Sequence, residues 1–236
     1  DAELVAEVRR AAPHLTFVWA RDRGTLDELG LEPGARTFVG PDLTWLAPLD
    51  PGGGALDRRG VAVAVAPHAG LDPQTWGPAL ASLPRPVRPW PFWTERDADG
   101  RVLRSLLPEA DVPAEHHPDV GRASQVVVSA RYHGLVFALQ LGRPVVGIGD
   151  SPKVRRLLHE QGLADWHVPA DRPDRVGPVV AGLLADLGTA EARAAEVHDR
   201  LVGEAAAAAA RAWALAEQEA RPLEGRSGVR RRLRLD

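Results

Sequence analysis

The chain has no cysteine, no methionine and no asparagine among its 236 residues. The absence of cysteine excludes a disulfide framework, a thiolate zinc site and a cysteine nucleophile. The absence of asparagine excludes N-glycosylation. There is also no run of about 18 apolar residues, and no basic segment followed by an apolar one as in a signal peptide. We therefore expect a soluble, cytoplasmic protein without a transmembrane segment.

A strong excess of charge is also missing, because 29 basic and 32 acidic residues give a formal net charge of −3. Nucleic-acid-binding proteins normally carry a basic excess, so we expect no nucleic-acid partner. Lysine is nearly absent, since only Lys153 is Lys and every other basic residue is Arg. In such a sequence a single Lys is a candidate for a site that needs a compact point charge. Chance placement on a solvated helix is the alternative.

Apolar runs and helical patterns alternate along most of the chain. Val61 to Ala66, Gln125 to Ser129 and Pro144 to Ile148 are runs typical of parallel strands that are buried on both faces. The sequence therefore predicts a Rossmann-like α/β domain over residues 61–200, with a parallel sheet and helices on both faces. The other expected strands are 15–19, 37–39, 87–90 and 166–168, and the expected helices are 2–10, 73–83, 99–107, 119–123, 133–141, 152–161, 174–187 and 189–220.

Three further segments flank this domain. Residues 1–45 show the same pattern and are expected to be the C-terminal part of a truncated N-terminal α/β domain. Residues 46–60 include Gly52 to Gly54 and are predicted to be a linker. Residues 201–236 are predicted to be a C-terminal helix, in which the alanine run favours helix formation rather than binding, and a basic tail. We expect the tail to be solvated, with contact to anionic lipid or another subunit as the alternative.

Polar groups follow three of the predicted strands, where the carboxyl ends of parallel strands should meet. His68 follows the first strand, Arg131 and His133 follow the second, and Ser151 and Lys153 follow the third. Helices that begin at such turns direct free amide groups toward an anion. Arg131 adds a planar fork suited to a carboxylate or phosphate, and His133 can exchange a proton near neutral pH. The sequence therefore predicts a site for a small ligand with two anionic groups.

Each of these residues also has an ordinary structural explanation. Arg131 could pair with Asp150, Tyr132 could be a core aromatic residue, and His68 could be a neutral loop histidine. Their joint placement at one predicted sheet edge is what favours a ligand site.

Two other segments resemble binding motifs. His116-His117-Pro118-Asp119 has no partner at metal-ligand spacing, so we predict no metal site and expect a loop that leads into a helix. The aromatic segment Trp90-Pro91-Phe92-Trp93 could stack on a sugar. We expect it instead to cover an interface between domains.

The segment from Val126 to Gly162, VVVSARYHGLVFALQLGRPVVGIGDSPKVRRLLHEQG, resembles the polysaccharide pyruvyl transferase family. Members of that family carry an Arg-Leu-His motif after a strand and a Tyr-Asp-Pro-Lys-like turn one strand later. The stretch from Val18 to Asp22, followed by Leu29-Gly30 and Gly40-Pro41-Asp42, is similar to an Arg-Asp segment and an Asp-containing turn of the family. The resemblance implies a two-domain fold similar to GT-B glycosyltransferases, with residues 61–200 as the donor-binding C-terminal domain.

The resemblance also implies an enzyme that transfers pyruvate from phosphoenolpyruvate to a pair of sugar hydroxyls, forming a ketal in cell-surface glycan biosynthesis. Phosphoenolpyruvate is then the donor substrate, with no cofactor and no metal. The acceptor is a saccharide, and a lipid-linked acceptor would place the protein at the inner membrane face.

The same resemblance assigns roles to the candidate residues. Arg131 would hold an anionic group of the donor, and His133 would act as general acid or base. Lys153 would stabilise the departing phosphate together with the helix amino ends, and Ser151 would bind substrate beside it. Arg21 and His68 are the remaining candidate substrate-binding residues.

Two other functions stay open. A GT-B glycosyltransferase with a nucleotide-sugar donor would share the architecture. It should carry an acidic ribose-binding residue in a helix at the sheet edge, and Glu160 lies too near the end of its helix for that role. A non-catalytic binding module is the other alternative, because the N-terminal domain is expected to be truncated. The sequence leaves the oligomeric state open.

Overall fold

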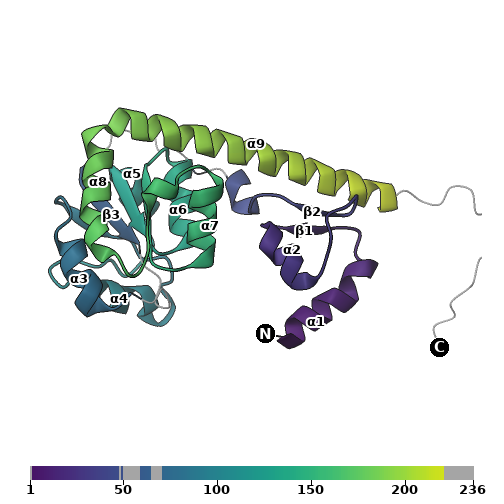
Figure 1. The fold of residues 1–236 in the computed structure, drawn as a ribbon, viewed down its shortest axis with the longest axis horizontal. Coiled ribbons are helices and arrows are strands. Elements are labelled where there is room, and N and C mark those ends of the chain that lie inside the picture. The colour runs from purple at the N-terminus through teal and green to yellow at the C-terminus, as the bar shows by residue number, and fades with distance from the viewer. Residues whose placement is uncertain (1, 48, 50–58, 65–70, 221–236) are drawn as a thin grey trace, which may run out of the picture. The chain divides into compact units, whose positions relative to one another are not determined.

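A computed structural model of the chain describes residues 2–47, 49, 59–64 and 71–220 (Figure 1). The chain divides into a smaller unit, Asp1–Leu46 with Leu201–Asp236, and a larger unit, Ala47–Arg200. The long helix α9 (Leu187–Ala220) contributes its first part to the larger unit and its remainder to the smaller one. The basic tail and residues 50–58 of the predicted linker lie outside the described residues.

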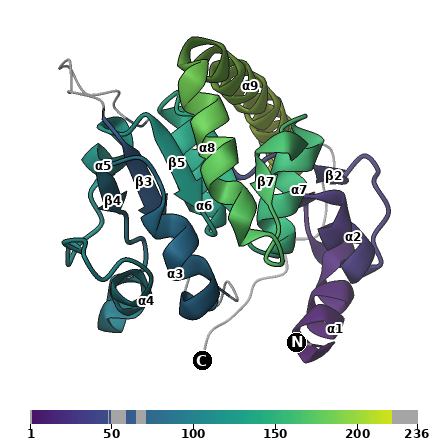
Figure 2. The ribbon, with the colours of Figure 1, turned by 60° about the vertical axis from the view of Figure 1, so that its left-hand side comes forward.

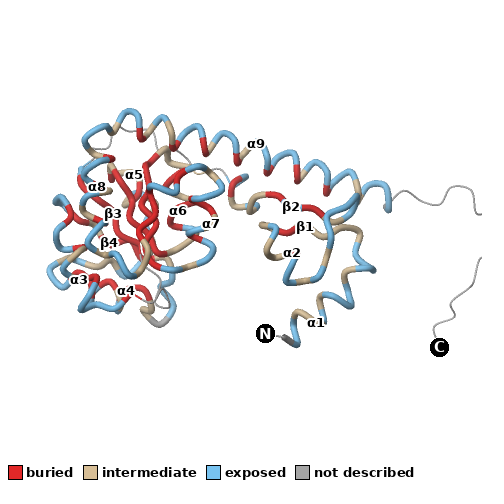
Figure 3. Tube along the Cα trace, viewed as in Figure 1, coloured by how far each residue is buried: buried red, intermediate tan, exposed pale blue. Residues whose placement is uncertain are grey.

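The larger unit is built on a parallel sheet of five strands in the order β4-β3-β5-β6-β7. In the register of the sheet, Val128 pairs with Val63 on one side and with Val146 on the other. All residues of the three central strands are buried (Figure 3), as their continuous apolar runs predict. The strands are β3 (Val61–Ala64), β4 (Val87–Pro89), β5 (Val126–Ser129), β6 (Val145–Ile148) and β7 (His167–Val168).

Helices cover both faces of this sheet. On one face, Leu135 of α6 (Tyr132–Gln140) and Val154 and Leu158 of α7 (Pro152–Glu160) approach Gly147 of β6. α5 (Pro118–Arg122) packs beside α6. On the other face, α8 (Val176–Ala185) lies against β5 and β6 and packs on α3 (Pro73–Ala81), with α4 (Ala98–Leu106) beside α3 (Figure 2). The predicted Rossmann-like α/β fold is therefore confirmed.

The smaller unit contains two parallel strands, β1 (Val18–Ala20) and β2 (Thr37–Val39), with the helices α1 (Ala2–Ala11) and α2 (Arg23–Leu29). Asp22 caps α2 by accepting a hydrogen bond from the Thr25 amide at 2.9 Å. The first strand was predicted to start at Leu15, but it starts three residues later. The Leu15 amide instead donates to Ala12 in a 3-10 turn, and the Leu15 side chain is 45% exposed.

The C-terminal half of α9 packs within the smaller unit. Ala208 and Ala212 form a buried cluster with Phe38 of β2, and Phe17 and Trp19 pack against that cluster. Methyl side chains let the helix backbone come close to the strands. The alanine run therefore provides a packing surface in addition to the helix-forming role that the sequence assigned to it.

We expect Gly40→Ala to destabilise this packing. A Cβ atom at Gly40 would lie 2.7 Å from the Ala208 Cβ and 2.9 Å from the Trp19 Nε1, closer than real contacts allow. Overpacking of this kind costs about 1–3 kcal/mol of unfolding free energy. Urea unfolding followed by fluorescence measures it. Gly34→Ala is the control, because a Cβ there meets nothing within 4 Å, and an equal loss in the two variants would contradict the close packing.

Candidate functional site

The carboxyl edge of the five-stranded sheet contains a change of direction in the strand order. From β3 the chain proceeds to β4 on one side, and it then continues with β5 on the other side of β3. Helices that follow such neighbouring strands lie on opposite faces, which leaves a crevice where α/β proteins bind ligands. The turn after β5 carries Arg131 and His133, as predicted. His68, which follows β3 in the sequence, lies outside the described residues.

The backbone of Arg131 is fixed by the end of β5. The Ser129 hydroxyl donates to the Arg131 carbonyl at 2.8 Å and accepts from the Arg131 amide at 3.0 Å. Gly134 leaves room for this hydroxyl, since a Cβ on Gly134 would lie 2.4 Å from the Ser129 Oγ and 3.3 Å from the Ala64 Cβ. Ser129 and Gly134 therefore fix the backbone position of Arg131 at the end of β5.

We expect Gly134→Ala to displace the Ser129 hydroxyl and to lower stability. The new methyl group has a buried strand on one side and the hydroxyl on the other, so the cost should be about 1–3 kcal/mol. Thermal unfolding of the variant measures the loss. A variant as stable as the wild type would show that Ser129 can move at no cost.

The side chain of Arg131 pairs with Asp99 of α4. Arg131 Nη2 donates to the Asp99 Oδ1, and the two side chains are 16% and 0% exposed. The alternative that Arg131 pairs with Asp150 is wrong. Asp150 instead accepts a hydrogen bond from the Ala170 amide at 3.0 Å, on the far side of β6 from the Arg131 turn.

His133 is exposed in the first turn of α6. Its ring meets the half-buried ring of Tyr132 edge-on at 5.3 Å between centroids and stacks on Phe137 one turn later at 6.2 Å. The imidazole is therefore oriented by aromatic contacts while it stays exposed at the amino end of α6. An exposed imidazole beside a helix amino end can exchange protons with a bound ligand.

The segment at His116 leads into α5 and contributes to an aromatic cluster. Pro118 is the first residue of α5, as expected of a loop that leads into a helix. The ring of His116 stacks on Trp90 at 5.6 Å and contacts Phe92 at 4.4 Å, and its Nδ1 lies 2.9 Å from the Pro91 carbonyl oxygen. Trp90 is fully buried in the larger unit and is a core residue there.

Ser151 and Lys153 lie at the amino end of α7, directly after β6. Because β6 is the neighbour of β5, this turn shares the sheet edge with Arg131 and His133. Lys153 is exposed. Ser151 occupies the N-cap position of α7, but its side chain makes no capping hydrogen bond to that helix.

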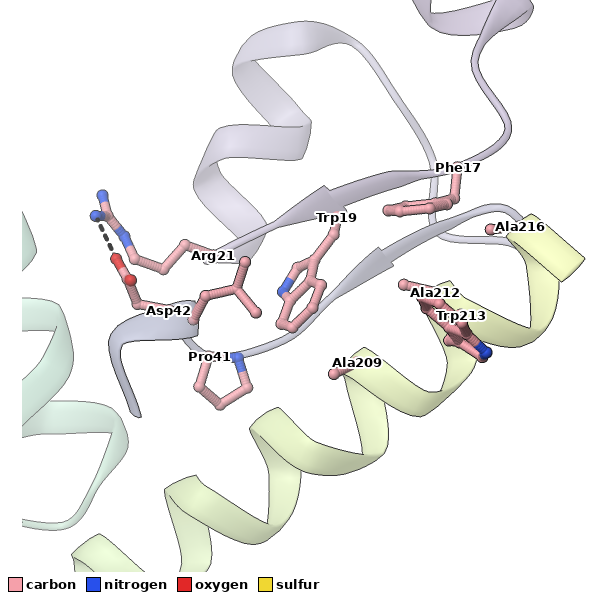
Figure 4. Close-up of a pocket in the computed structure, with 10 residues that line it drawn as sticks. Phe17, Trp19, Arg21, Pro41, Asp42, Ala209, Ala212, Trp213 and Ala216 are labelled. Carbon is pink, nitrogen blue, oxygen red and sulfur yellow. Dashed lines mark hydrogen bonds and ion pairs between the residues drawn. The ribbon is translucent and has the colours of Figure 1, made fainter. Parts of the chain in front are cut away.

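Arg21 lies in the smaller unit, after β1. Its guanidinium pairs with Asp42, with 3.4 Å between Nη1 and Oδ2. Both residues line an open pocket of about 570 Å³ in the smaller unit (Figure 4). Trp19 and Phe17 form one wall of the pocket and α9 forms the other.

Among the residues that the structure describes, no three His, Asp or Glu side chains gather in a group that could hold a metal ion. No helix among the described residues combines the length and the apolar character that crossing a membrane requires.

The segment at the carboxyl edge is also similar to a known family. Residues 122–152 match the polysaccharide pyruvyl transferase family. The match runs from the last residue of α5 to the first residue of α7 and includes Arg131, His133 and Ser151. It confirms the resemblance over this segment and supports a transferase of polysaccharide biosynthesis that acts on a sugar acceptor. No curated protein has significant similarity to the chain.

Sequence reasoning did not identify Asp99 or Ser129 as parts of this site. Ser129 directly precedes the predicted turn, so a hydroxyl at a strand end was an available signal. Asp99 is 32 residues from its partner Arg131. A carboxylate in the first turn of a helix is a common feature of soluble proteins, and nothing in its local pattern pointed to Arg131.

Proposed function

We propose that the protein binds phosphoenolpyruvate at the carboxyl edge of the five-stranded sheet and transfers its pyruvyl group to a saccharide. The observation that carries this proposal is the family match, which spans two neighbouring strand ends. The same segment contains an arginine, an exposed histidine and two helix amino ends, which suit a donor with a carboxylate and a phosphate.

In this proposal the donor is held by groups from two turns. The guanidinium of Arg131 binds one anionic group through the N–H groups that Asp99 does not use. The amino ends of α6 and α7 and the ammonium of Lys153 bind the other anionic group, because free amide groups and a point charge stabilise a phosphate. Ser151 adds a hydroxyl at the same turn. Arg21, on the basis of the resemblance, and His68, on the basis of its place after β3 in the sequence, are proposed as further substrate-binding residues.

The proposed reaction converts phosphoenolpyruvate and two acceptor hydroxyls into a ketal and phosphate. Two bonds form between the hydroxyl oxygens and C2 of the donor, while the bond between C2 and the phosphate oxygen breaks and the double bond between C2 and C3 becomes a single bond. Of the two hydroxyl protons, one ends on C3, which becomes a methyl group, and the other ends on phosphate. His133 is the proposed carrier of a proton between these atoms.

Calorimetric titration of the full chain with phosphoenolpyruvate, and separately with UDP, tests the donor. We expect phosphoenolpyruvate to bind and UDP to be silent. With a saccharide diol present, phosphorus NMR should then show release of inorganic phosphate, and proton NMR should show the ketal methyl signal growing in step with it. Binding of UDP alone would indicate a nucleotide-sugar glycosyltransferase, and no response to either ligand would contradict the proposed donor site.

A further inference from the structure

Asp99 is a buried carboxylate that the proposed reaction does not use directly. Its side chain has no solvent exposure, yet it lies in the first turn of α4, where most helices keep their acidic residues in water. A buried carboxylate needs partners that stabilise its charge. Asp99 has such partners on two other elements of the sheet edge, and one of them is Arg131.

We infer that Asp99 is a positioning residue for Arg131, and this inference rests on the proposed function. Asp99 Oδ2 accepts hydrogen bonds from the amides of Phe92 and Trp93, both at 2.9 Å. Oδ1 accepts from the Arg131 guanidinium. The carboxylate therefore connects the turn after β4 to the turn after β5.

The start of α4 holds the carboxylate in place. Asp97, just before the helix, has a φ of 53°, a left-handed conformation that aspartate tolerates better than most residues. The Asp99 amide donates back to the Trp93 carbonyl at 3.1 Å, which closes the loop between Trp93 and Asp99. A carboxylate in the first helical turn is also favoured by the helix dipole. Asp99 is thus held by contacts within its own segment, independently of Arg131.

The ion pair between Arg131 and Asp99 fixes the orientation of the Arg131 guanidinium and adds no net charge to the site. Asp99 neutralises the guanidinium and occupies its Nη2, and the buried Nε of Arg131 has no hydrogen-bond partner in the described part of the chain. A planar guanidinium held at one corner presents its other N–H groups in a fixed plane. Arg131 then contributes directed hydrogen bonds to one anionic group of the donor, while Lys153 and the helix amino ends supply the net positive potential.

A purely structural role for Asp99 predicts different behaviour. If the carboxylate only closed the loop from Phe92 to Asp99, its loss would lower stability and leave the folded protein with normal turnover. If it positions Arg131, its loss should change the Arg131 side chain and the turnover of the folded protein. Asp99→Asn separates the two, because the amide oxygen can still accept from Phe92 and Trp93 while the ion pair is lost.

The first experiment needs no substrate. In the full chain labelled with ¹⁵N-arginine, the Arg131 Nε–H signal is assigned by its loss in Arg131→Lys. We expect Asp99→Asn to shift this signal and to speed its exchange with water by 10-fold or more. Glu191→Gln, which breaks the buried ion pair of Arg143, is the matched control and should leave the signal in place. An unmoved signal in Asp99→Asn overturns the inference.

The second experiment uses phosphoenolpyruvate and a saccharide diol. We expect Asp99→Asn to lower kcat by about 10-fold, while the Kd of phosphoenolpyruvate changes less than 3-fold, because the lost orientation is offset by the removal of a negative charge. In an Arg131→Lys background the same substitution should have little further effect on kcat, since contacting residues are not additive. Equal effects in the two backgrounds would overturn the inference.

Failure of the proposed function and failure of this inference give different results. If the wild type neither binds nor turns over phosphoenolpyruvate, the proposed function fails, and the NMR result still decides whether Asp99 positions Arg131. If Asp99→Asn does not fold, Asp99→Glu replaces it. The longer carboxylate keeps the charge but should displace the guanidinium and shift the same signal.

Discussion

Replacing His133 by glutamine should lower kcat for release of phosphate from phosphoenolpyruvate by about 10²- to 10⁴-fold, the usual contribution of a positioned general acid or base. His133 is exposed in the first turn of α6, and its ring contacts those of Tyr132 and Phe137. Glutamine keeps a polar side chain of similar reach but carries no proton between donor and acceptor. The Kd of phosphoenolpyruvate should therefore change little.

Two measurements make the test specific. The wild-type profile of kcat against pH should have a limb that arises from titration of the imidazole, and this limb should be missing in His133→Gln. His198→Gln is the control, because His198 belongs to α9 and not to the turns that follow β5 and β6. A His133→Gln variant with normal kcat would remove His133 from the reaction.

Replacing Arg131 by alanine should raise the Kd of phosphoenolpyruvate by about 10- to 100-fold. A charge-assisted contact to an anion contributes about 1.5–3 kcal/mol, and each 1.4 kcal/mol is a factor of ten. The value of kcat/KM should fall further, by about 10²- to 10⁴-fold, because the donor also loses its orientation. Calorimetry gives the Kd, and initial rates of phosphate release give kcat/KM.

This substitution also leaves the buried carboxylate of Asp99 without its charge partner. Removing one member of a buried ion pair costs about 3–5 kcal/mol, so titrations should be made well below the lowered unfolding temperature. Arg143→Ala is the matched control, because Arg143 is also buried and pairs with Glu191. It should lose stability and keep the wild-type Kd. If the two variants bind equally well, Arg131 is not part of the donor site.

The strands and helices of the larger unit were largely predictable from local pattern. The run from Gln125 to Ser129 became β5 with one residue less, and the helix expected at 152–161 became α7 over Pro152–Glu160. Buried parallel strands are apolar throughout, and Gly and Pro mark their ends, so the signal is local and strong. The first strand was misplaced because Leu15 and Thr16 have strand-forming side chains but no pairing partner in the described sheet.

Two contacts between distant segments were not predictable in this way. The ion pair between Arg131 and Asp99 joins two helix starts on different crossovers of the sheet. The packing of the alanine run on Phe38 joins residues that are about 170 positions apart in the chain. The sequence around an alanine or an aspartate does not indicate which distant residue it contacts, because these contacts form only when the helices and strands pack.

The sequence by itself determined the parallel α/β architecture, the order of strand and helix, and the turn where Arg131 and His133 lie. These follow from side-chain periodicity and turn residues, which act within a few positions of the chain. Only the tertiary structure decided that Arg131 pairs with Asp99 rather than with Asp150. The reason is that a buried guanidinium pairs with a carboxylate that is also buried and lies beside it. Only the fold brings the side chains of Arg131 and Asp99 together.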